Sequence, residues 1–320
     1  MSAQHMLEEL AEHRGSGATV HPVSLNLVAF VEDSKILDWI AQRTDDIAAR
    51  HASRSVLLDA SQEDSGAVKG AAGKSEQIRL GVQGRSAAEL RSLVHDLLVP
   101  NVQTVLLWAG PSLLDERFEV LKSLSHVIIL DSSRGCAGPQ ALRELAEVAD
   151  EQLEGTVRDL AYMRLLPWQD LIALFFDDHV LAAELPQLRG VEVAAGSEAE
   201  ASYLVGWLAS RLSWTPCGLH RFCNSASETV ETQVSVEGEP RRVQRVTLRS
   251  AATTFSACLD EKDPALVCLR VKSRSRDDKR CAPLREVDTI SLVQRAVMSG
   301  NNGAIYVETL HMVRTLLEQT

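Results

Sequence analysis

VSLNLVAFV (Val23–Val31) opens the pattern that decides the fold of the first half of the chain. Its continuous apolar run is typical of a strand that is buried on both faces. Ser34 can cap a helix behind this strand, and SVLLDA (Ser55–Ala60) has the composition of a second buried strand. A strand, a helix-length crossover and another strand predict a parallel pair with a right-handed connection.

The same alternation continues as far as residue 153. The segments between apolar runs carry helix signals, such as the capping box of Ser86 and Glu89. Residues 61–76 are small and polar, so we expect a loop there. The further strands are IRLGV (Ile78–Val82), VQTVLLW (Val102–Trp108) and HVIILD (His126–Asp131). Strands that alternate with helices predict an α/β fold with an open, mostly parallel, Rossmann-like sheet covered on both faces.

The second half of the chain has a different pattern. LRGVEVAAG (Leu188–Gly196) predicts a strand, and a capped helix follows it. Between residues 217 and 272, several runs alternate apolar and polar residues, as in an antiparallel sheet with one solvent-exposed face. We expect the charged stretch Lys272–Arg280 to be a loop, followed by two helices over Leu284–Met298 and Ala304–Glu318.

These patterns predict three regions. Residues 1–22 are expected to be a flexible or helical arm, and residues 23–155 an α/β domain. Residues 156–320 are expected to be a β-rich α+β domain with an antiparallel sheet and two C-terminal helices.

Charge and hydropathy narrow the class of protein. The chain has 33 Lys and Arg against 44 Asp and Glu, a net charge of −11, which argues against a nucleic-acid binder. No apolar run of about 18 residues predicts a membrane span, and the acidic N-terminus does not resemble a signal peptide. We expect a cytoplasmic protein whose cysteines are thiols by default. The six cysteines are Cys136, Cys217, Cys223, Cys258, Cys268 and Cys281.

Two nucleotide motifs are incomplete. GAAGKS (Gly70–Ser75) resembles the tail of a phosphate-binding loop, but Val68 stands where that motif needs glycine and a strand follows instead of a helix. We interpret it as a solvated loop. The strand Val23–Val31 is not followed by G-x-G-x-x-G, so the Rossmann-like architecture implies no cofactor.

The segment Asp131–Gly135 follows a predicted strand at the edge where open α/β sheets bind ligands. Its hydroxyl groups and Arg134 could hold an anion. The same residue types are also ordinary in a turn, with the arginine solvated. A contact role for Arg134 and a plain turn both stay open.

Cys217, His220 and Cys223 have a spacing compatible with a zinc site. On an extended strand, however, residues 217 and 223 face one side and residue 220 the other, so we expect no metal. Small buried cysteines with a surface histidine are the alternative. A redox pair between strands that involves Cys258, Cys268 or Cys281 is another, and no known catalytic signature occurs.

DLAYMRLLPWQDLIALFFDD (Asp159–Asp178) predicts an amphipathic helix that begins at Pro167. The segment resembles a motif of the glucose-6-phosphate dehydrogenase assembly protein family (OpcA), of the type D-x-x-W-x-R-L-x-P-W-R-x-L. Tyr162 and Gln169 depart from that pattern, where the family has Trp and Arg. The matching residues are Asp159, Arg164, Leu165, Pro167, Trp168 and Leu171.

The likeness to this family extends over roughly residues 23–300. SLNLVAFV followed by ARHASRSVLLD (Ala49–Asp59) is similar to its first two strands, with Ala52 in place of the usual Pro. VQTVLLWAGP, HVIILDSS and GWLASRLSW (Gly206–Trp214) follow in the same order. Each motif is short, but their co-linear order makes the resemblance specific.

The resemblance implies a protein that is not an enzyme and that promotes the assembly or activation of glucose-6-phosphate dehydrogenase. That enzyme is the NADP-dependent entry point of the oxidative pentose phosphate pathway. In photosynthetic bacteria the system is linked to redox control, which makes thioredoxin a further candidate partner. We therefore predict a cytoplasmic assembly factor or allosteric activator without cofactor, nucleic acid or membrane. The alternative is an enzyme or sugar-phosphate-binding protein that uses the crevice of the N-terminal sheet.

Trp and Arg are favoured as anchors of protein interfaces. The candidate partner contacts are Arg164, Trp168 and Gln169, followed by Arg54 and Arg134. Trp168 also lies on the apolar face of its helix, so core packing is the alternative for it. If the protein is a thiol switch instead, the candidate redox residues are Cys217, Cys223, Cys258, Cys268 and Cys281.

Overall fold

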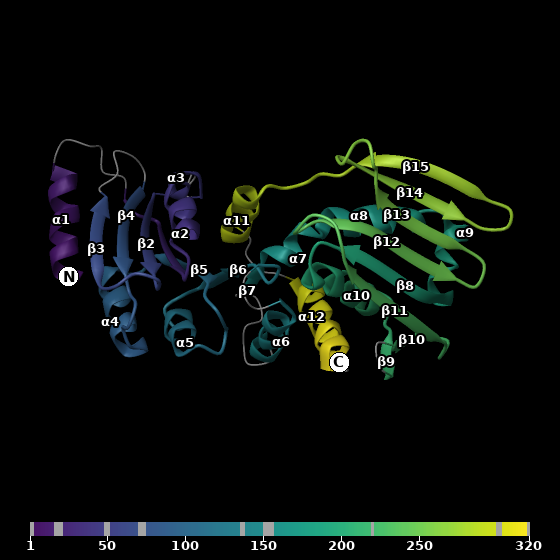
Figure 1. Cartoon of the computed structure of the whole chain (residues 1–320), viewed down its shortest axis with the longest axis horizontal. Helices are drawn as coiled ribbons and strands as arrows, with labels where there is room; N and C mark the ends of the chain where they lie inside the picture. Colours follow the sequence, from purple (N-terminus) through teal and green to yellow (C-terminus); the bar gives the residue numbers. More distant parts are fainter. Residues whose placement is uncertain are drawn as a thin grey trace. The chain divides into compact units, whose positions relative to one another are not determined.

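The computed structural model of the chain forms two compact units, each built on its own sheet (Figure 1). The first unit comprises Met1–Asp131, Gly155–Leu160 and Asp288–Asn301. The second comprises Ser132–Glu154, Ala161–Val287 and Asn302–Thr320. The structure describes residues 3–15, 22–47, 52–69, 75–134, 138–149, 157–218, 221–298 and 303–318. Within these ranges, no helix has both the length and the apolar character needed to span a membrane.

The first unit contains a seven-stranded sheet in the order β3-β4-β2-β1-β5-β6-β7. Neighbouring strands are parallel, except for β3 with β4. The strands are β1 (Leu25–Val31), β2 (Ser53–Asp59), β3 (Ser65–Lys69), β4 (Ser75–Gly81), β5 (Gln103–Ala109), β6 (Val127–Leu130) and β7 (Val157–Asp159). Every side chain of β1 is buried, which explains its continuous apolar run at the centre of a parallel sheet.

The described residues of the first unit form six helices. They are α1 (Ala3–Gly15), α2 (Ser34–Ala41), α3 (Thr44–Ile47), α4 (Ala87–Leu97), α5 (Glu116–Lys122) and α11 (Thr289–Met298). The predicted capping box is present at α4, where Ser86 and Glu89 each accept a hydrogen bond from the other's backbone N–H. α1 contacts β3 and α4 and buries Met6 and Leu10. Residues 3–15 are therefore a packed helix of this unit.

The second unit contains an eight-stranded sheet in the order β15-β14-β13-β12-β8-β11-β10-β9. The pairs are antiparallel, except for β8 with β11. The strands are β8 (Leu188–Ala195), β9 (Thr215–Gly218), β10 (Arg221–Cys223), β11 (Thr229–Val236), β12 (Val243–Ser250), β13 (Thr254–Leu259), β14 (Leu266–Lys272) and β15 (Asp277–Pro283). Apolar and polar side chains alternate along β12 to β14, as expected when one face is packed and the other is wet.

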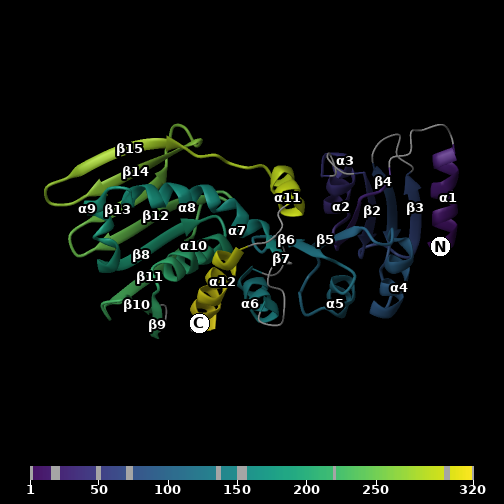
Figure 2. The ribbon, with the colours of Figure 1, turned by 180° about the vertical axis from the view of Figure 1, so that it is seen from behind.

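Helices cover one face of this second sheet (Figure 2). The helical segments of the unit are α6 (Gly138–Ala149), α7 (Leu160–Arg164), α8 (Leu166–Ala173), η1 (Leu174–Phe176), α9 (His179–Ala182), η2 (Leu185–Gln187), α10 (Glu198–Arg211) and α12 (Gly303–Glu318). α10 contacts β8, β11 and α12. Phe175 and Phe176 of η1 lie 5.5 and 5.0 Å from the ring of Phe255 on β13. These contacts build the core of the unit.

The predicted fold class is confirmed, because a largely parallel sheet is followed along the chain by a β-rich unit. Two predicted loops are wrong in part. Residues 61–76 contain β3, a polar strand at the edge of the first sheet, where exposure to water is tolerated. The charged stretch Lys272–Arg280 contains the start of β15, which pairs with β14. Its Asp277 forms a 2.5 Å ion pair with Arg270 of β14, which supports this pairing.

The two units do not follow a single division at residue 155. α6 contacts α12 and α10 of the second unit, although it follows a strand of the first. α11 contacts α3 and β6 of the first unit, although it follows the last strand of the second. Tertiary packing decides to which unit each of these two helices belongs. Their neighbours along the sequence do not show this.

Candidate functional site

The carboxyl ends of β1 and β5 form the place where open α/β sheets usually bind a ligand. β1 pairs with β2 on one side and with β5 on the other, so the strand order reverses there. The connections leave toward opposite faces at such a point, which normally leaves a crevice. The residues that follow β1, β2 and β5 therefore determine whether a nucleotide could enter.

The turn after β1 lacks the features that accept a phosphate. Glu32 and Asp33 join β1 to α2, and the sequence contains no glycine from residue 18 to residue 65. Asp33 is the N-cap of α2 and accepts a 2.8 Å hydrogen bond from the backbone N–H of Lys35. A carboxylate therefore already occupies the positive end of the helix, and its charge repels a phosphate.

Asp59 ends β2 at the position where dinucleotide-binding folds use an acidic residue to hold a ribose hydroxyl. Here the side chain is only 1% exposed. It accepts a 2.8 Å hydrogen bond from Ser34 Oγ, and bonds of 3.0 and 2.6 Å from the backbone N–H and Oγ of Ser61. Hydroxyl groups of the chain itself thus take the place that a ribose would need.

Aromatic and charged side chains cover the end of β5. Trp108 stacks on Phe30 with ring centroids 4.5 Å apart, and the guanidinium of Arg117 lies 5.0 Å from the Phe30 ring. Gly110 allows this arrangement, because a Cβ there would stand 2.4 Å from the Trp108 ring. Hydrogen bonds from Arg117 lower the pKa of Asp115 below its usual value, so this carboxylate stays charged beside the arginine. The chain's own residues close the crevice.

Three of the predicted partner contacts lie around α7 and α8 of the second unit. Trp168 is 3% exposed and Gln169 is 7% exposed. Arg164 donates a 2.9 Å hydrogen bond to the buried carboxylate of Glu200 and another to Ser133. In the isolated chain these residues hold α7 and α8 against α10 and the loop that contains Ser133. Their contact with a partner stays a prediction.

The other two predicted contacts belong to different units. Arg54 of β2 is buried and donates 2.9 Å hydrogen bonds to Glu76 and to the carbonyl of Leu97. Arg134 is exposed after β6. A role for Arg54 or Arg134 in binding stays a prediction as well.

A hollow of about 570 Å³ lies over β8, where sequence reasoning indicated no site. Gly190 is one of the residues that line it, together with arginines from three strands. Arg249 pairs with Glu192 at 2.5 Å, and Arg221 lies 3.9 Å from Glu231. The residues that line the hollow are Arg189, Gly190, Val191, Glu192, Arg221, Glu231, Thr232, Gln233, Arg249 and Ser250. These charged residues come together only through the pairing register of their strands, which cannot be predicted from the sequence.

Two family models match most of the chain. Residues 44–149 match the glucose-6-phosphate dehydrogenase subunit N-terminal domain, and residues 155–310 match the corresponding C-terminal domain, both of OpcA. The chain belongs to the OpcA family.

Curated relatives named OxPP cycle protein OpcA agree with this assignment. The relative from Synechocystis is 31% identical over 44% of the chain and 30% of its own length. The relative from Synechococcus elongatus is 29% identical over 62% of the chain and 44% of its own length. The chain thus spans less than half the length of the curated OpcA relatives it matches.

Solved structures resemble this OpcA-family chain in fold alone. Glucose-6-phosphate 1-dehydrogenase from Mycobacterium avium has a TM-score of 0.53 at 11% identity, over 93% of this chain and 92% of that one. A 3-ketoreductase from Actinomadura kijaniata has a TM-score of 0.52 at 12% identity, over 93% and 96% of the two chains. Both likenesses confirm the Rossmann-like architecture of this OpcA-family chain.

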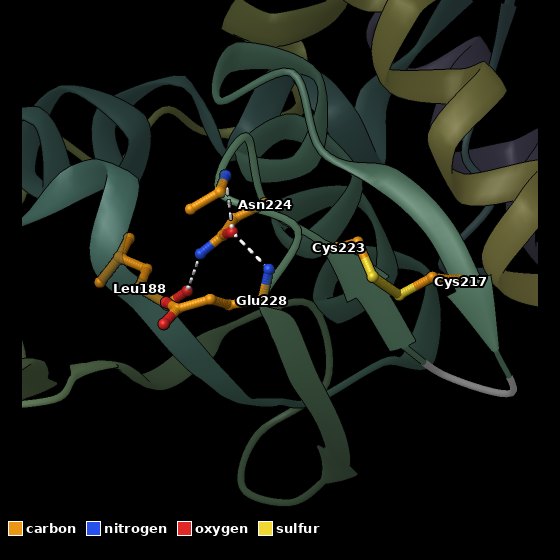
Figure 3. The surroundings of a disulfide bond; sticks show 6 residues. Leu188, Cys217, Cys223, Asn224 and Glu228 are labelled. Carbon is orange, nitrogen blue, oxygen red and sulfur yellow. Dashed lines mark hydrogen bonds between the residues drawn. A yellow bond between two sulfur atoms is a disulfide. The ribbon is translucent and has the colours of Figure 1, made fainter.

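One disulfide of this OpcA-family chain corrects the expected geometry of its segment. β9 and β10 form a hairpin in which Cys217 and Cys223 are joined, with Cα atoms 5.7 Å apart (Figure 3). The segment is therefore not one extended strand, and His220 lies outside the described residues. Beside the disulfide, Asn224 is 5% exposed and donates 2.9 Å to the carbonyl of Pro186. It also donates a 3.3 Å hydrogen bond to the carbonyl of Leu188, which ties the end of the hairpin to the start of β8, and it accepts a 2.9 Å hydrogen bond from the backbone N–H of Glu228 (Figure 3).

A row of three cysteines crosses neighbouring strands of the second sheet of this OpcA-family chain. Cys258 on β13 stands opposite Cys268 on β14, and Cys268 forms a disulfide with Cys281 on β15. Burial raises the pKa of the Cys258 thiol. Contrary to the expectation of free thiols, four of the described cysteines are paired, because the β14–β15 register places Cys268 opposite Cys281 and the β9–β10 hairpin brings Cys217 to Cys223. Cys136 lies outside the described residues, and a redox role for any of these cysteines stays a prediction.

Proposed function

We propose that this OpcA-family chain is a non-catalytic partner of glucose-6-phosphate dehydrogenase, which it binds and shifts toward the active oligomeric form. The closed crevice of the first unit is the observation that carries the proposal. Asp33, Asp59 and Arg117 already have partners within the chain at the positions where a dinucleotide would bind. The family descriptions support the identity of the partner, because both matched domains are named as dehydrogenase subunit domains.

A binding protein can activate an enzyme without performing any chemistry. If it binds the active conformation more tightly than the inactive one, the enzyme population shifts by that difference in affinity. A difference of about 3 kcal/mol corresponds to roughly a hundredfold change in the equilibrium. The chain needs only a surface that recognises one state of the dehydrogenase.

The test is a titration of purified dehydrogenase with this protein. We expect a rise in kcat/KM for glucose 6-phosphate and co-elution of the two proteins at the mass of a defined complex. The proposal is wrong if the kinetics and the elution both stay unchanged at micromolar concentrations.

The competing hypothesis is an enzyme or sugar-phosphate-binding protein that uses the same crevice. Carboxylates in the turn after β1 argue against it, because Glu32 and Asp33 would face a phosphate there. Calorimetric titration of this protein alone with NADP, and separately with glucose 6-phosphate, separates the two hypotheses. We expect no heat of binding from either ligand below millimolar concentration, whereas saturable binding would support the competing hypothesis.

A further inference from the structure

Three neighbouring strands of the second sheet carry one cysteine each. β13, β14 and β15 lie side by side at one end of the sheet (Figure 1). Cys258 of β13 stands directly opposite Cys268 of β14, and Cys268 stands directly opposite Cys281 of β15. Directly opposite residues of paired antiparallel strands point to the same face of the sheet. The three cysteine side chains therefore form one row across the strands.

The row lies on the face of the sheet opposite to the helices. Phe255 packs against η1, and Ala257, which shares its face, is fully buried. Successive side chains of a strand alternate between faces, so Cys258 points to the other side, which we call the open face. Cys258 is partly exposed, Cys268 is 6% exposed, and Cys281 on the edge strand is exposed. A reagent in solution therefore reaches Cys281 most easily.

The spacing of the strands would allow a disulfide between Cys258 and Cys268. Two residues further along this ladder, the backbone N–H of Asp260 donates a 2.9 Å hydrogen bond to the carbonyl of Leu266. Hydrogen-bonded pairs recur at every second residue, so Cys258 and Cys268 also form such a pair, with Cα atoms about 5.5 Å apart. Disulfides span Cα distances of about 4.4–6.8 Å. Cys268 is thus within bonding reach of Cys258, although it is bonded to Cys281.

A thiol beside a disulfide can replace one of the two bonded sulfurs. The Cys258 thiol gives its proton to water, and the thiolate attacks the Sγ atom of Cys268. A bond between Cys258 and Cys268 forms while the bond between Cys268 and Cys281 breaks. Cys281 leaves as a thiolate and takes a proton from water. One S–S bond replaces another, so the exchange consumes neither an oxidant nor a reductant.

Charged groups influence both ends of this exchange. Burial raises the pKa of the Cys258 thiol, whereas Arg245 of β12 and Lys279 of β15 favour its thiolate. A thiolate of higher pKa is less abundant but more nucleophilic. At the other end, the carboxylate of Asp260 lies within 4.8 Å of the Cys281 sulfur. Because two negative charges repel each other, Asp260 favours release of Cys281 as a neutral thiol.

We propose that Cys258, Cys268 and Cys281 form a three-cysteine relay, in which the disulfide moves from the edge pair to the inner pair and leaves Cys281 as an exposed thiol. Cys281 is then the modification site of the sheet. A low-molecular-weight disulfide would react there by the same exchange, forming a mixed disulfide with Cys281 and releasing one thiol. The inference goes beyond the proposed function and does not depend on it, since the relay lies within the second sheet.

The test asks which cysteine of the relay carries the free thiol. The air-oxidised full-length protein is incubated with iodoacetamide under native conditions. It is then digested at acidic pH without reduction, and its labelled and disulfide-linked peptides are mapped by mass spectrometry. We expect label on Cys281 together with a growing fraction of the disulfide between Cys258 and Cys268, because alkylation of the released thiol prevents the reverse exchange.

Cys258→Ser is the matched control. It removes the attacking thiol and leaves the disulfide between Cys268 and Cys281 in place. We expect at least tenfold less label on Cys281 in this variant than in the unmodified protein. Equal labelling of Cys281 in the two proteins would show incomplete oxidation instead of exchange, and would overturn the relay. Absence of label on Cys281 in the unmodified protein would also overturn it.

Cys281→Ser tests the inner bond by itself. After air oxidation, we expect this variant to contain a disulfide between Cys258 and Cys268. Two free thiols at these positions, in a variant that still unfolds cooperatively on heating, would overturn the relay. These results are independent of the proposed function, which the titration of the dehydrogenase tests, so a failure of one is distinguishable from a failure of the other.

Discussion

The two sheets of the chain differ in where they leave room for a ligand or a partner. In the first sheet, the crevice between β1 and β5 is closed by side chains such as Asp59 and Trp108. In the second sheet, one face packs against helices while the other carries exposed charges and a hollow of about 570 Å³. The comparison teaches that the two sheets of one chain can differ in where they leave room, since one packs side chains at its strand ends and the other leaves a face exposed.

The largest expected effect tests the difference between the two faces of the second sheet. Phe255→Ala should lower the free energy of unfolding by about 3–5 kcal/mol, because it leaves a cavity against Phe175 and Phe176. The adjacent Ser256→Ala, on the open face, should change it by less than about 0.5 kcal/mol. Urea unfolding of both variants checks this. Similar losses would contradict the assignment of the two faces.

The next effect concerns the disulfide that joins β14 to the edge strand β15. Under oxidising conditions Cys268→Ser should lower the free energy of unfolding by about 3 kcal/mol, since the bond closes a loop in the unfolded chain. Cys217→Ser opens a shorter loop and should cost about 2 kcal/mol. Cys258→Ser serves as the control. Both losses should disappear in thermal unfolding measured with a dithiol reductant, and losses that persist there would contradict the disulfides.

A smaller effect tests the closed crevice of the first sheet. Asp59→Ala removes the acceptor of Ser34 and Ser61 and should lower the free energy of unfolding by about 1–3 kcal/mol. Thermal unfolding measures the loss, with the exposed Glu261→Ala as the control. If Asp59→Ala proves neutral, the hydrogen bonds that close the crevice contribute nothing to stability.

The smallest expected effect depends on pH and concerns Asp115 in the first unit. Asp115 caps α5 and accepts hydrogen bonds from Arg117, which lower its pKa, so Asp115→Ala should cost about 1 kcal/mol at pH 7. This contribution is fully present above the pKa of unfolded aspartate, about 3.9, and is lost as the pH falls through the lower folded value. Unfolding curves of the two proteins should therefore converge below pH 4. A difference that grows in acid would have the wrong sign.

Much of the fold could be predicted from the sequence, because many of its helices and strands are indicated by residues within their own segments. The apolar run of β1 and the capping box at Ser86 each report their own element. β3 and β15 could not be found in this way, since their polar residues form strands only through pairing with β4 and β14.

The site was harder to predict than the fold. The missing glycines after β1 could be read directly, whereas the bonds of Asp59 that complete the closure could not. Burial of Trp168 was one of two alternatives that helical periodicity left open. The hollow over Gly190 combines residues of β8, β10, β11 and β12, and no pattern within a single segment of sequence indicates it.

The membership of α11 in the first unit has a consequence for how the chain folds during its synthesis. Gln294 of α11 donates a hydrogen bond to the backbone carbonyl of Asp46, which precedes it by about 250 residues. At translation rates of roughly 5–20 residues per second, the ribosome needs on the order of ten seconds or more between these two residues. The first unit therefore waits, with the surface that α11 will cover still exposed, until α11 itself has been made.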